Sequence, residues 1–213
     1  MKKNLIVCGL IVLSMAGAAQ AAIVLDADWA VNETIPAGNP SGITVSQSFP
    51  NLYNGTITSV SVDLNISGGF NGGVYGYLVY QDANNHTATE VLLNHIGTSP
   101  SNPIFGSSGA GINVTLNDSG TVNGSIHNAT GTPTGTWLPD STAALNSTFG
   151  GLAADGTWTL FLAEMYAGDT SGTLESWGLE ITAAVPESAT YGLIAGMGLL
   201  AVSVIGQFRR KKV

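Results

Sequence analysis

Segment 57–66 alternates apolar and polar side chains, and this period of two is the strongest fold signal in the chain. Side chains two residues apart point to the same face of a β-strand, so the segment predicts a strand with one buried face. Segments 157–163 and 173–181 repeat the pattern, each with a tryptophan on its apolar face. Further strand candidates are 43–49, 74–80, 90–96 and 112–116. Short strands separated by clusters of Gly, Asn, Asp, Pro and Ser predict an all-β protein, an antiparallel, jelly-roll-like β-sandwich.

Charge is distributed very unevenly along the 213 residues. The chain has 14 Asp and Glu residues against 6 Lys and Arg residues, for a formal net charge of −8. All the basic residues lie at the two ends, and the stretch from Asn4 to Phe208 contains no Lys or Arg. Binding to nucleic acid depends on cationic side chains that displace the counterions of the phosphates. We therefore expect no nucleic-acid partner for the folded body.

The N-terminus has the three parts of a secretory signal peptide. Two lysines precede an apolar run at 5–15, and small residues follow. Ala19-Gln-Ala21 matches the A-x-A pattern at which signal peptidase cuts. We predict cleavage between Ala21 and Ala22, so that 1–21 is the signal peptide.

The C-terminus has a second apolar run, at 191–208, which contains no charged residue. A helix of about 18 residues can cross the hydrocarbon core of a bilayer. Four basic residues follow the run directly: Arg209, Arg210, Lys211 and Lys212. Because positive charge stays on the cytoplasmic side of a membrane, we predict a transmembrane helix that leaves the folded body, 22–184, outside.

Val185-Pro186-Glu187 stands shortly before this apolar run. The order of a V-P-E motif, an apolar helix and a basic cluster resembles the PEP-CTERM sorting signal of Gram-negative bacteria. The resemblance implies that 185–213 is a sorting signal processed by an exosortase. The protein would then pass through an inner-membrane-anchored intermediate to the cell envelope or the extracellular matrix. A proline usually follows the glutamate in that family, whereas Ser188 follows it here; the alternative is a plain single-pass membrane anchor.

The two tryptophan-containing segments carry a second resemblance. Gly156-Thr-Trp-Thr-Leu-Phe-Leu and Gly172-Thr-Leu-Glu-Ser-Trp-Gly-Leu-Glu-Ile resemble the C-terminal half of the P domain (P/Homo B), which follows the catalytic domain of subtilisin-like proprotein convertases. The resemblance covers about 35–182 and implies a β-sandwich that has no catalytic domain of its own. Gly72-Gly73-Val74 replaces the Gly-Asp-Leu that the family often has before its third strand.

Together these features predict an exported, non-catalytic envelope or extracellular-matrix protein with a P-like structural or binding domain. One alternative is an accessory domain of a subtilisin-like serine endopeptidase system. The other is a calcium-stabilised carbohydrate or adhesion module.

We expect no catalytic residue and no enzymatic activity. A hydrolase needs a base that titrates near neutral pH, which directs attention to the three histidines. His86 falls in a predicted turn, His95 in a predicted strand and His127 in a predicted loop, and none has a nucleophile elbow near it. The only cysteine, Cys8, lies in the predicted signal peptide, so the exported chain has no cysteine nucleophile and no disulfide.

Calcium is a possible ligand because it prefers carboxylate, amide and carbonyl oxygens. Four acids fall in predicted loops or turns and are the candidate ligands: Asp118, Asp140, Asp155 and Asp169. Single aspartates in turns also cap their own backbone, and no dense D-x-D-x-D loop is present.

An extracellular polysaccharide or a surface protein is the other class of partner that we consider. Sugar sites combine aromatic rings with polar hydrogen-bonding groups, and the candidates by residue type are Trp29, Tyr53, Tyr75, Tyr77 and Trp137. Trp158 and Trp177, in contrast, are predicted to pack between the two sheets.

Overall fold

The computed structural model describes residues 20–49, 55–168 and 170–186. Ala22–Val185 form one compact unit. Several predicted features lie outside the described residues: Ala19, Tyr53, Asp169, Glu187, the apolar run 191–208 and the four basic residues 209–212. Within the described part, no helix has the length and hydropathy needed to span a membrane.

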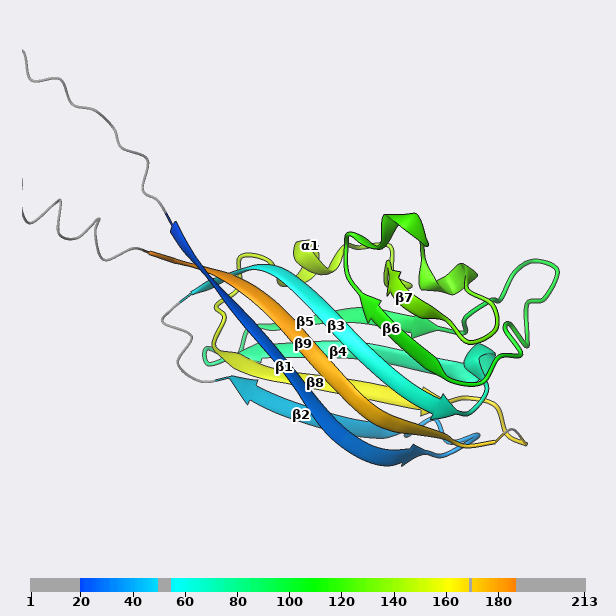
Figure 1. The fold of residues 1–213 in the computed structure, drawn as a ribbon. Coiled ribbons are helices and arrows are strands. Elements are labelled where there is room, and N and C mark those ends of the chain that lie inside the picture. The colour runs from blue at the N-terminus through cyan, green and yellow to red at the C-terminus, as the bar shows by residue number, and fades with distance from the viewer. Residues whose placement is uncertain (1–19, 50–54, 169, 187–213) are drawn as a thin grey trace, which may run out of the picture. The chain divides into compact units, whose positions relative to one another are not determined.

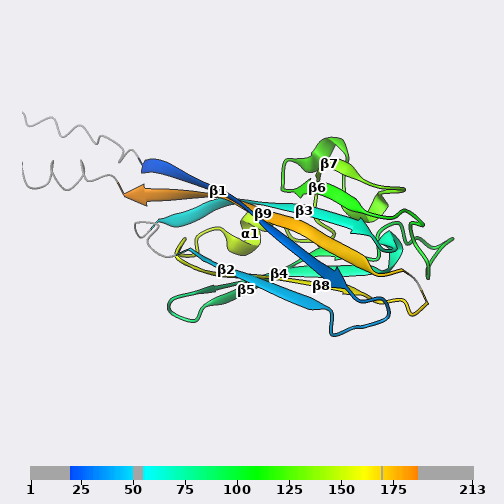
Figure 2. The same cartoon turned by 60° about the horizontal axis from the view of Figure 1, so that its bottom comes forward.

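Two β-sheets form a sandwich, which confirms the predicted fold class (Figures 1 and 2). In spatial order, the five-stranded sheet contains β1 (Gln20–Ile35), β9 (Gly172–Pro186), β3 (Thr56–Gly68), β6 (Ile112–Leu116) and β7 (Thr134–Trp137). The four-stranded sheet contains β2 (Ile43–Phe49), β8 (Gly156–Glu164), β4 (Val74–Asp82) and β5 (Thr87–Asn94). The short helices are η1 (Asn71–Gly73), η2 (Gly120–Val122), η3 (Ile126–Asn128) and α1 (Leu145–Phe149).

The core lies between the two sheets and is built from the alternating residues. In β3, Val60, Val62 and Leu64 are buried, while the polar residues between them face outward on the five-stranded sheet. Trp158 and Trp177 are fully buried, as predicted. The Trp158 ring contacts the rings of other core residues at centroid distances of 4.4 Å and 5.0 Å. Burying such large rings is a main source of stability for the sandwich.

Strand β1 was not predicted, although it is the longest strand of the structure. Its outward side chains include Asp26, Asp28 and Asn32, and its inward side chains include the small Ala27. The apolar alternation is therefore weak, and the strand forms because it pairs beside β9. The predicted cleavage residues Ala21 and Ala22 lie in β1.

The end of β9 includes two residues of the predicted sorting motif. Val185 and Pro186 are the last two residues of that strand, and the Val185 side chain is nearly buried. The strand is thus longer than the segment 173–181 that alternation alone indicated.

Three further predictions need correction. Strand β7 is not among the strands predicted from the sequence, and it pairs with β6 in parallel rather than antiparallel. The reason is that the connection through η2 and η3 returns the chain to the same end of the sheet. Strand β5 ends at Asn94, so His95 does not lie in a strand as predicted. Its φ of 53° is in the left-handed region and ends the strand.

Candidate functional site

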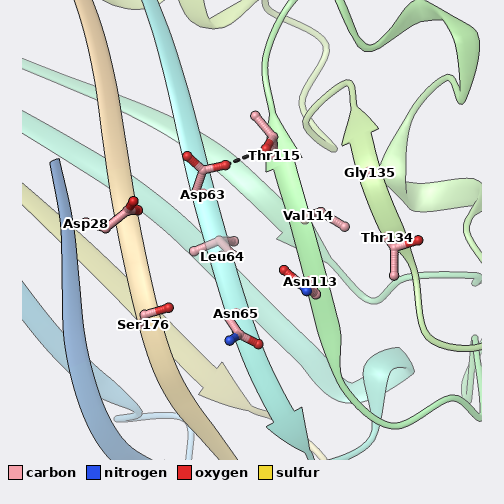
Figure 3. A pocket seen from close by; sticks show the side chains of 10 residues that line it. All are labelled: Asp28, Asp63, Leu64, Asn65, Asn113, Val114, Thr115, Thr134, Gly135 and Ser176. Carbon is pink, nitrogen blue, oxygen red and sulfur yellow. Dashed lines mark hydrogen bonds between the residues drawn. The ribbon is translucent and has the colours of Figure 1, made fainter. Parts of the chain in front are cut away.

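A polar hollow of about 490 Å³ opens on the outer face of the five-stranded sheet (Figure 3). Every strand of that sheet contributes to it. The lining residues are Asp28 from β1, Ser176 from β9, Asp63, Leu64 and Asn65 from β3, Asn113, Val114 and Thr115 from β6, and Thr134 and Gly135 from β7. Because the residues come from strands rather than from loops, the backbone holds them in fixed positions.

A glycine in β9 leaves the space that the Asp28 carboxylate occupies. Gly178 of β9 is the register partner of Asp63 in β3, and it has no side chain that could fill the space between the neighbouring strands. A Cβ atom at Gly178 would lie 2.0 Å from Oδ1 of Asp28. The Asp28 carboxylate therefore extends over β9 toward Asp63, as Figure 3 shows.

The two carboxylates of the hollow differ in their hydrogen bonds. The Thr115 hydroxyl donates to the Asp63 carboxylate across the β3–β6 pair. Burial raises the pKa of the Asp28 carboxyl, and the negative charges of Asp63 and Asp26 raise it further. A ligand that donates hydrogen bonds to both carboxylates would relieve this repulsion.

Amides and hydroxyls complete the hollow. Asn65 and Asn113 are register partners on β3 and β6, and their side-chain amides make no hydrogen bond with any residue in the described ranges. Ser176 and Thr134 add hydroxyl groups at the two sides. An amide both donates and accepts, so the hollow offers acceptors and donors to a ligand that is rich in hydroxyl groups.

The three predicted calcium ligands that lie within the described residues, Asp118, Asp140 and Asp155, do not come together as a metal site. Both Asp118 oxygens accept backbone N–H groups, from Leu145 and Asn146 at 2.9 Å each, so this carboxylate caps α1. Asp155 stands at the start of β8, and Asp169 lies outside the described residues. Within 20–49, 55–168 and 170–186 no three His, Cys, Asp or Glu residues are grouped as a metal site would require.

Asp140, the fourth predicted ligand, is part of a chain of hydrogen bonds. Its Oδ2 accepts from the Asn94 N–H at 3.0 Å and lies 3.0 Å from Nδ1 of His127. Nε2 of His127 lies 3.4 Å from the Thr98 hydroxyl. Burial raises the pKa of Asp140, and the hydrogen bond and charge of His127 partly offset that rise. The order carboxylate, imidazole, hydroxyl is that of a hydrolase triad, but the secondary hydroxyl is distant and no nucleophile elbow carries it.

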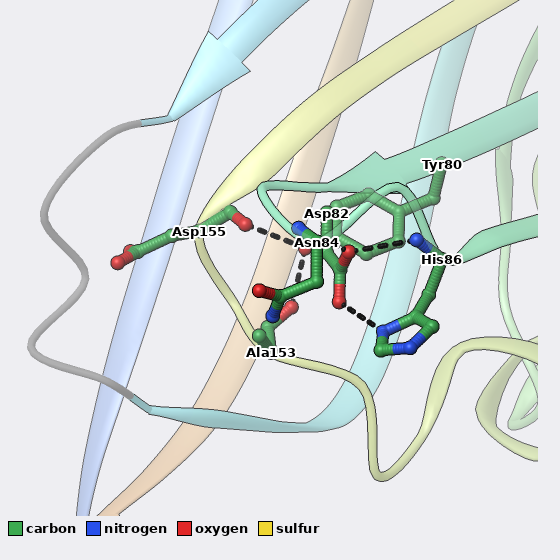
Figure 4. Close-up of polar contacts among 6 residues, drawn as sticks. All are labelled: Tyr80, Asp82, Asn84, His86, Ala153 and Asp155. Atoms are coloured by element: carbon green, nitrogen blue, oxygen red, sulfur yellow. Dashed lines mark hydrogen bonds and ion pairs between the residues drawn. The ribbon is translucent and has the colours of Figure 1, made fainter.

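A second polar cluster closes the β4–β5 hairpin (Figure 4). The Asp82 carboxylate accepts the backbone N–H groups of Asn84 and His86 and pairs with Nδ1 of His86, all at 2.8 Å. Burial raises the pKa of Asp82, but these hydrogen bonds outweigh burial and leave the pKa below its ordinary value. The Tyr80 hydroxyl donates to the carbonyl groups of Ala153 and Asp155, which joins the hairpin to the start of β8. This cluster stabilises a turn, as predicted for the segment around His86.

Two buried acids, Glu90 and Glu164, are not among the residues singled out from the sequence. Glu90 in β5 accepts hydrogen bonds from the hydroxyls of Ser141 and Thr148, and burial raises its pKa. Glu164 at the end of β8 accepts from the Phe70 N–H at 3.3 Å. Both follow the inward alternation of their strands, which is the signal that could have found them.

The four predicted sugar-binding aromatic residues that the structure describes do not line the hollow. Trp29 contacts the Trp177 ring at 5.0 Å, at the border of the core. Tyr75 and Tyr77 lie on the outer face of the four-stranded sheet, where Tyr77 stacks on Phe161 at 4.7 Å. Trp137 is partly buried, and its indole N–H donates to the Thr134 carbonyl at 2.9 Å.

Comparison with known proteins gives matches among the solved structures, two of which are described here. No family model and no curated protein matches the sequence. A crystal structure of the Aeromonas sobria serine protease in complex with its chaperone matches with a TM-score of 0.45 and 15% identity, over 77% of this chain and 27% of that chain. A crystal structure of the serine protease of Aeromonas sobria matches with a TM-score of 0.44 and 17% identity, over 76% and 27%. The chain therefore spans about a quarter of the length of the chains that it matches.

Proposed function

We propose that this chain is an exported, non-catalytic envelope or matrix protein whose β-sandwich binds a neutral saccharide in the hollow of the five-stranded sheet. The observation that carries the proposal is the pair of carboxylates, Asp28 and Asp63, that line the hollow from the strands on either side of Gly178 in β9. Two carboxylates at such a site can each accept hydrogen bonds from the hydroxyls of one sugar ring.

Charge favours a neutral sugar over an acidic one. The described residues include twelve of the fourteen acids and no Lys or Arg, so an anionic sugar would be repelled from the hollow. The amides of Asn65 and Asn113 supply the donors that the carboxylates lack. The shallow shape of the hollow is suited to part of a polysaccharide chain rather than to an enclosed small molecule.

The route of export rests on sequence. The signal peptide pattern and the V-P-E tail support cleavage by signal peptidase and processing by an exosortase, and the segments at 156–162 and 172–181 support a P-like domain. We infer no catalysis, because Thr98 is a poor nucleophile at 3.4 Å from His127. Intact-mass analysis of the fractionated native protein tests both cleavages; a mass that retains 1–21 or 187–213 contradicts this route.

Binding is tested on an array of neutral and anionic polysaccharides with a matched pair of variants. Asp63→Asn removes one charge inside the hollow, whereas Glu33→Gln removes one charge from an exposed residue of β1 that does not line it. We expect neutral glycans to bind the wild type and Glu33→Gln, and to lose at least about tenfold in affinity for Asp63→Asn. Equal binding by all three proteins, or no binding by any, overturns the proposal.

A further inference from the structure

The end of the sandwich formed by three connecting segments exposes an apolar patch. Ile104 is 57% exposed and Phe105 62%, and Met165, which is 38% exposed, directly precedes Tyr166 in the chain. Phe70 and Tyr166 lie beside them. We name the set Phe70, Ile104, Phe105, Met165 and Tyr166 the apolar tip. A cluster of this kind on a soluble domain marks an interaction site more often than scattered apolar residues do.

The apolar tip is an ordered surface. The Tyr166 ring contacts the rings of Phe70 at 6.0 Å, His95 at 5.6 Å and Phe105 at 6.2 Å. The Tyr166 hydroxyl also donates to the Ile104 carbonyl, which links the segment after β8 to the segment after β5. Side chains that are held in place lose little entropy when a partner binds.

The position of the apolar tip also suits an interaction site. The start of β1 and the end of β9 lie at one end of the sandwich, and the start of β9 lies at the other (Figures 1 and 2). Gly68 at the end of β3 pairs with Gly172 at the start of β9, so Phe70 and the apolar tip belong to that second end. A strand rises about 3.3 Å per residue, so β9 separates the two ends by roughly 45 Å. A partner bound at the apolar tip would therefore not contact the end of the unit where β1 begins and β9 ends.

Charge indicates what kind of partner fits. No Lys or Arg occurs among the described residues, and the apolar tip itself has no acidic side chain. The surrounding field is negative and attracts cations, while exposed aromatic rings accept Lys and Arg side chains over their faces. A partner must therefore present apolar side chains flanked by basic ones, since an acidic partner would be repelled.

We propose that the apolar tip is a docking surface for a protein segment in which apolar residues alternate with lysine or arginine. This site is separate from the hollow of the five-stranded sheet, so each can fail without the other. Phe105 inserts between the apolar side chains of the partner, and the rings of Phe70 and Tyr166 contact its basic side chains.

The test uses the exported protein and three labelled peptides of equal length: alternating leucine and lysine, alternating leucine and glutamate, and lysine alone. We expect the leucine–lysine peptide to bind most tightly, and Phe105→Ser to weaken it about tenfold or more. Val122→Ser, which changes an isolated apolar residue that is 96% exposed, serves as the control and should bind as the wild type does. Ile104→Ser gives a second variant if Phe105→Ser lowers the melting temperature.

The outcomes distinguish specific binding at the apolar tip from non-specific attraction of a basic peptide to an acidic protein. Equal binding of the lysine peptide and the leucine–lysine peptide overturns the proposal, because charge alone would then explain the binding. Unchanged affinity in both Phe105→Ser and Ile104→Ser overturns it as well, as does equal binding of the leucine–glutamate peptide.

Discussion

The acids in the interior of the sandwich and the acids of the hollow have the same chemistry and different surroundings. Glu90 and Asp140 are enclosed by hydroxyl, backbone and imidazole groups that hydrogen-bond to them. Asp28 and Asp63 share an open surface with amides that have no partner in the described structure. In a body without Lys or Arg, hydrogen bonds take the place of salt bridges. An acid with a full set of internal donors therefore supports the fold, whereas one that faces an open hollow is available to a ligand.

The largest effect is expected at Glu90. Glu90→Ala removes the acceptor for the hydroxyls of Ser141 and Thr148 and leaves a space in the interior, so we expect a loss of about 2–3 kcal/mol in the free energy of unfolding. For a domain of this size that lowers Tm by roughly 4–12 °C. Thermal unfolding followed by circular dichroism measures it. Glu90→Gln keeps an acceptor without the charge and should unfold within about 0.5 kcal/mol of the wild type; an equal loss in both variants would contradict the role assigned to the hydrogen bonds.

A smaller loss is expected at Asp140. Asp140→Ala leaves the Asn94 N–H and Nδ1 of His127 without their shared acceptor, which should cost about 1–2 kcal/mol. Asp140→Asn can still accept from both groups and is the control. Denaturant unfolding gives both values, and a wild-type midpoint for Asp140→Ala would show that water replaces the carboxylate without cost.

The pH dependence of stability follows from the shifted pKa values. Those of Glu90, Asp140 and Asp28 are raised above 4.5 for Glu and 3.8 for Asp, so the folded state holds these protons more tightly than the unfolded state does. The stability that these three carboxyl groups contribute to the folded state is complete below their ordinary pKa values. It is lost as the pH rises through their raised pKa values. Tm should therefore increase as the pH falls through the raised pKa values toward the ordinary ones.

The pKa of Asp82 is shifted in the opposite direction, and this limits the increase in Tm at lower pH. Its pKa is lowered, so its contribution is present above 3.8 and is lost as the pH falls through the lowered value. Calorimetric scans across this range should show a maximum in the mildly acidic region. A Tm that falls steadily from pH 7 to pH 5 would show that the buried acids are not held in the way described here.

The smallest effect on stability is expected in the hollow. Asp28→Asn removes repulsion from Asp63 and Asp26 and breaks no hydrogen bond within the described structure, so the free energy of unfolding should change by less than about 0.5 kcal/mol, and toward greater stability. Chemical denaturation at low ionic strength measures the change, which added salt should reduce. A loss as large as that of Glu90→Ala would remove the distinction between the two groups of acids.

Alternation along the chain was enough to predict the sandwich, most strands and the buried tryptophans, because a period of two is a local property of the sequence. Strand β1 could not be found in this way, since its small and acidic residues obscure the pattern until β9 pairs with it. The hollow was equally hidden, because Asp28 and Gly178 are far apart in the sequence and meet only in the sheet. Asp118 was selected as a metal ligand by its residue type, while its actual hydrogen bonds to the N–H groups of α1 come from residues 27 and 28 positions further on.

Displacing the Asp28 carboxylate without changing any charge tests the central claim most directly. Gly178→Ala adds one methyl group, which would displace the Asp28 carboxylate from its place over β9. Titration calorimetry with a neutral polysaccharide that binds the wild type should give an affinity at least about tenfold weaker for this variant, at a Tm close to that of the wild type. An unchanged affinity would mean that saccharide binds elsewhere on the protein and that the carboxylates over Gly178 have no part in it.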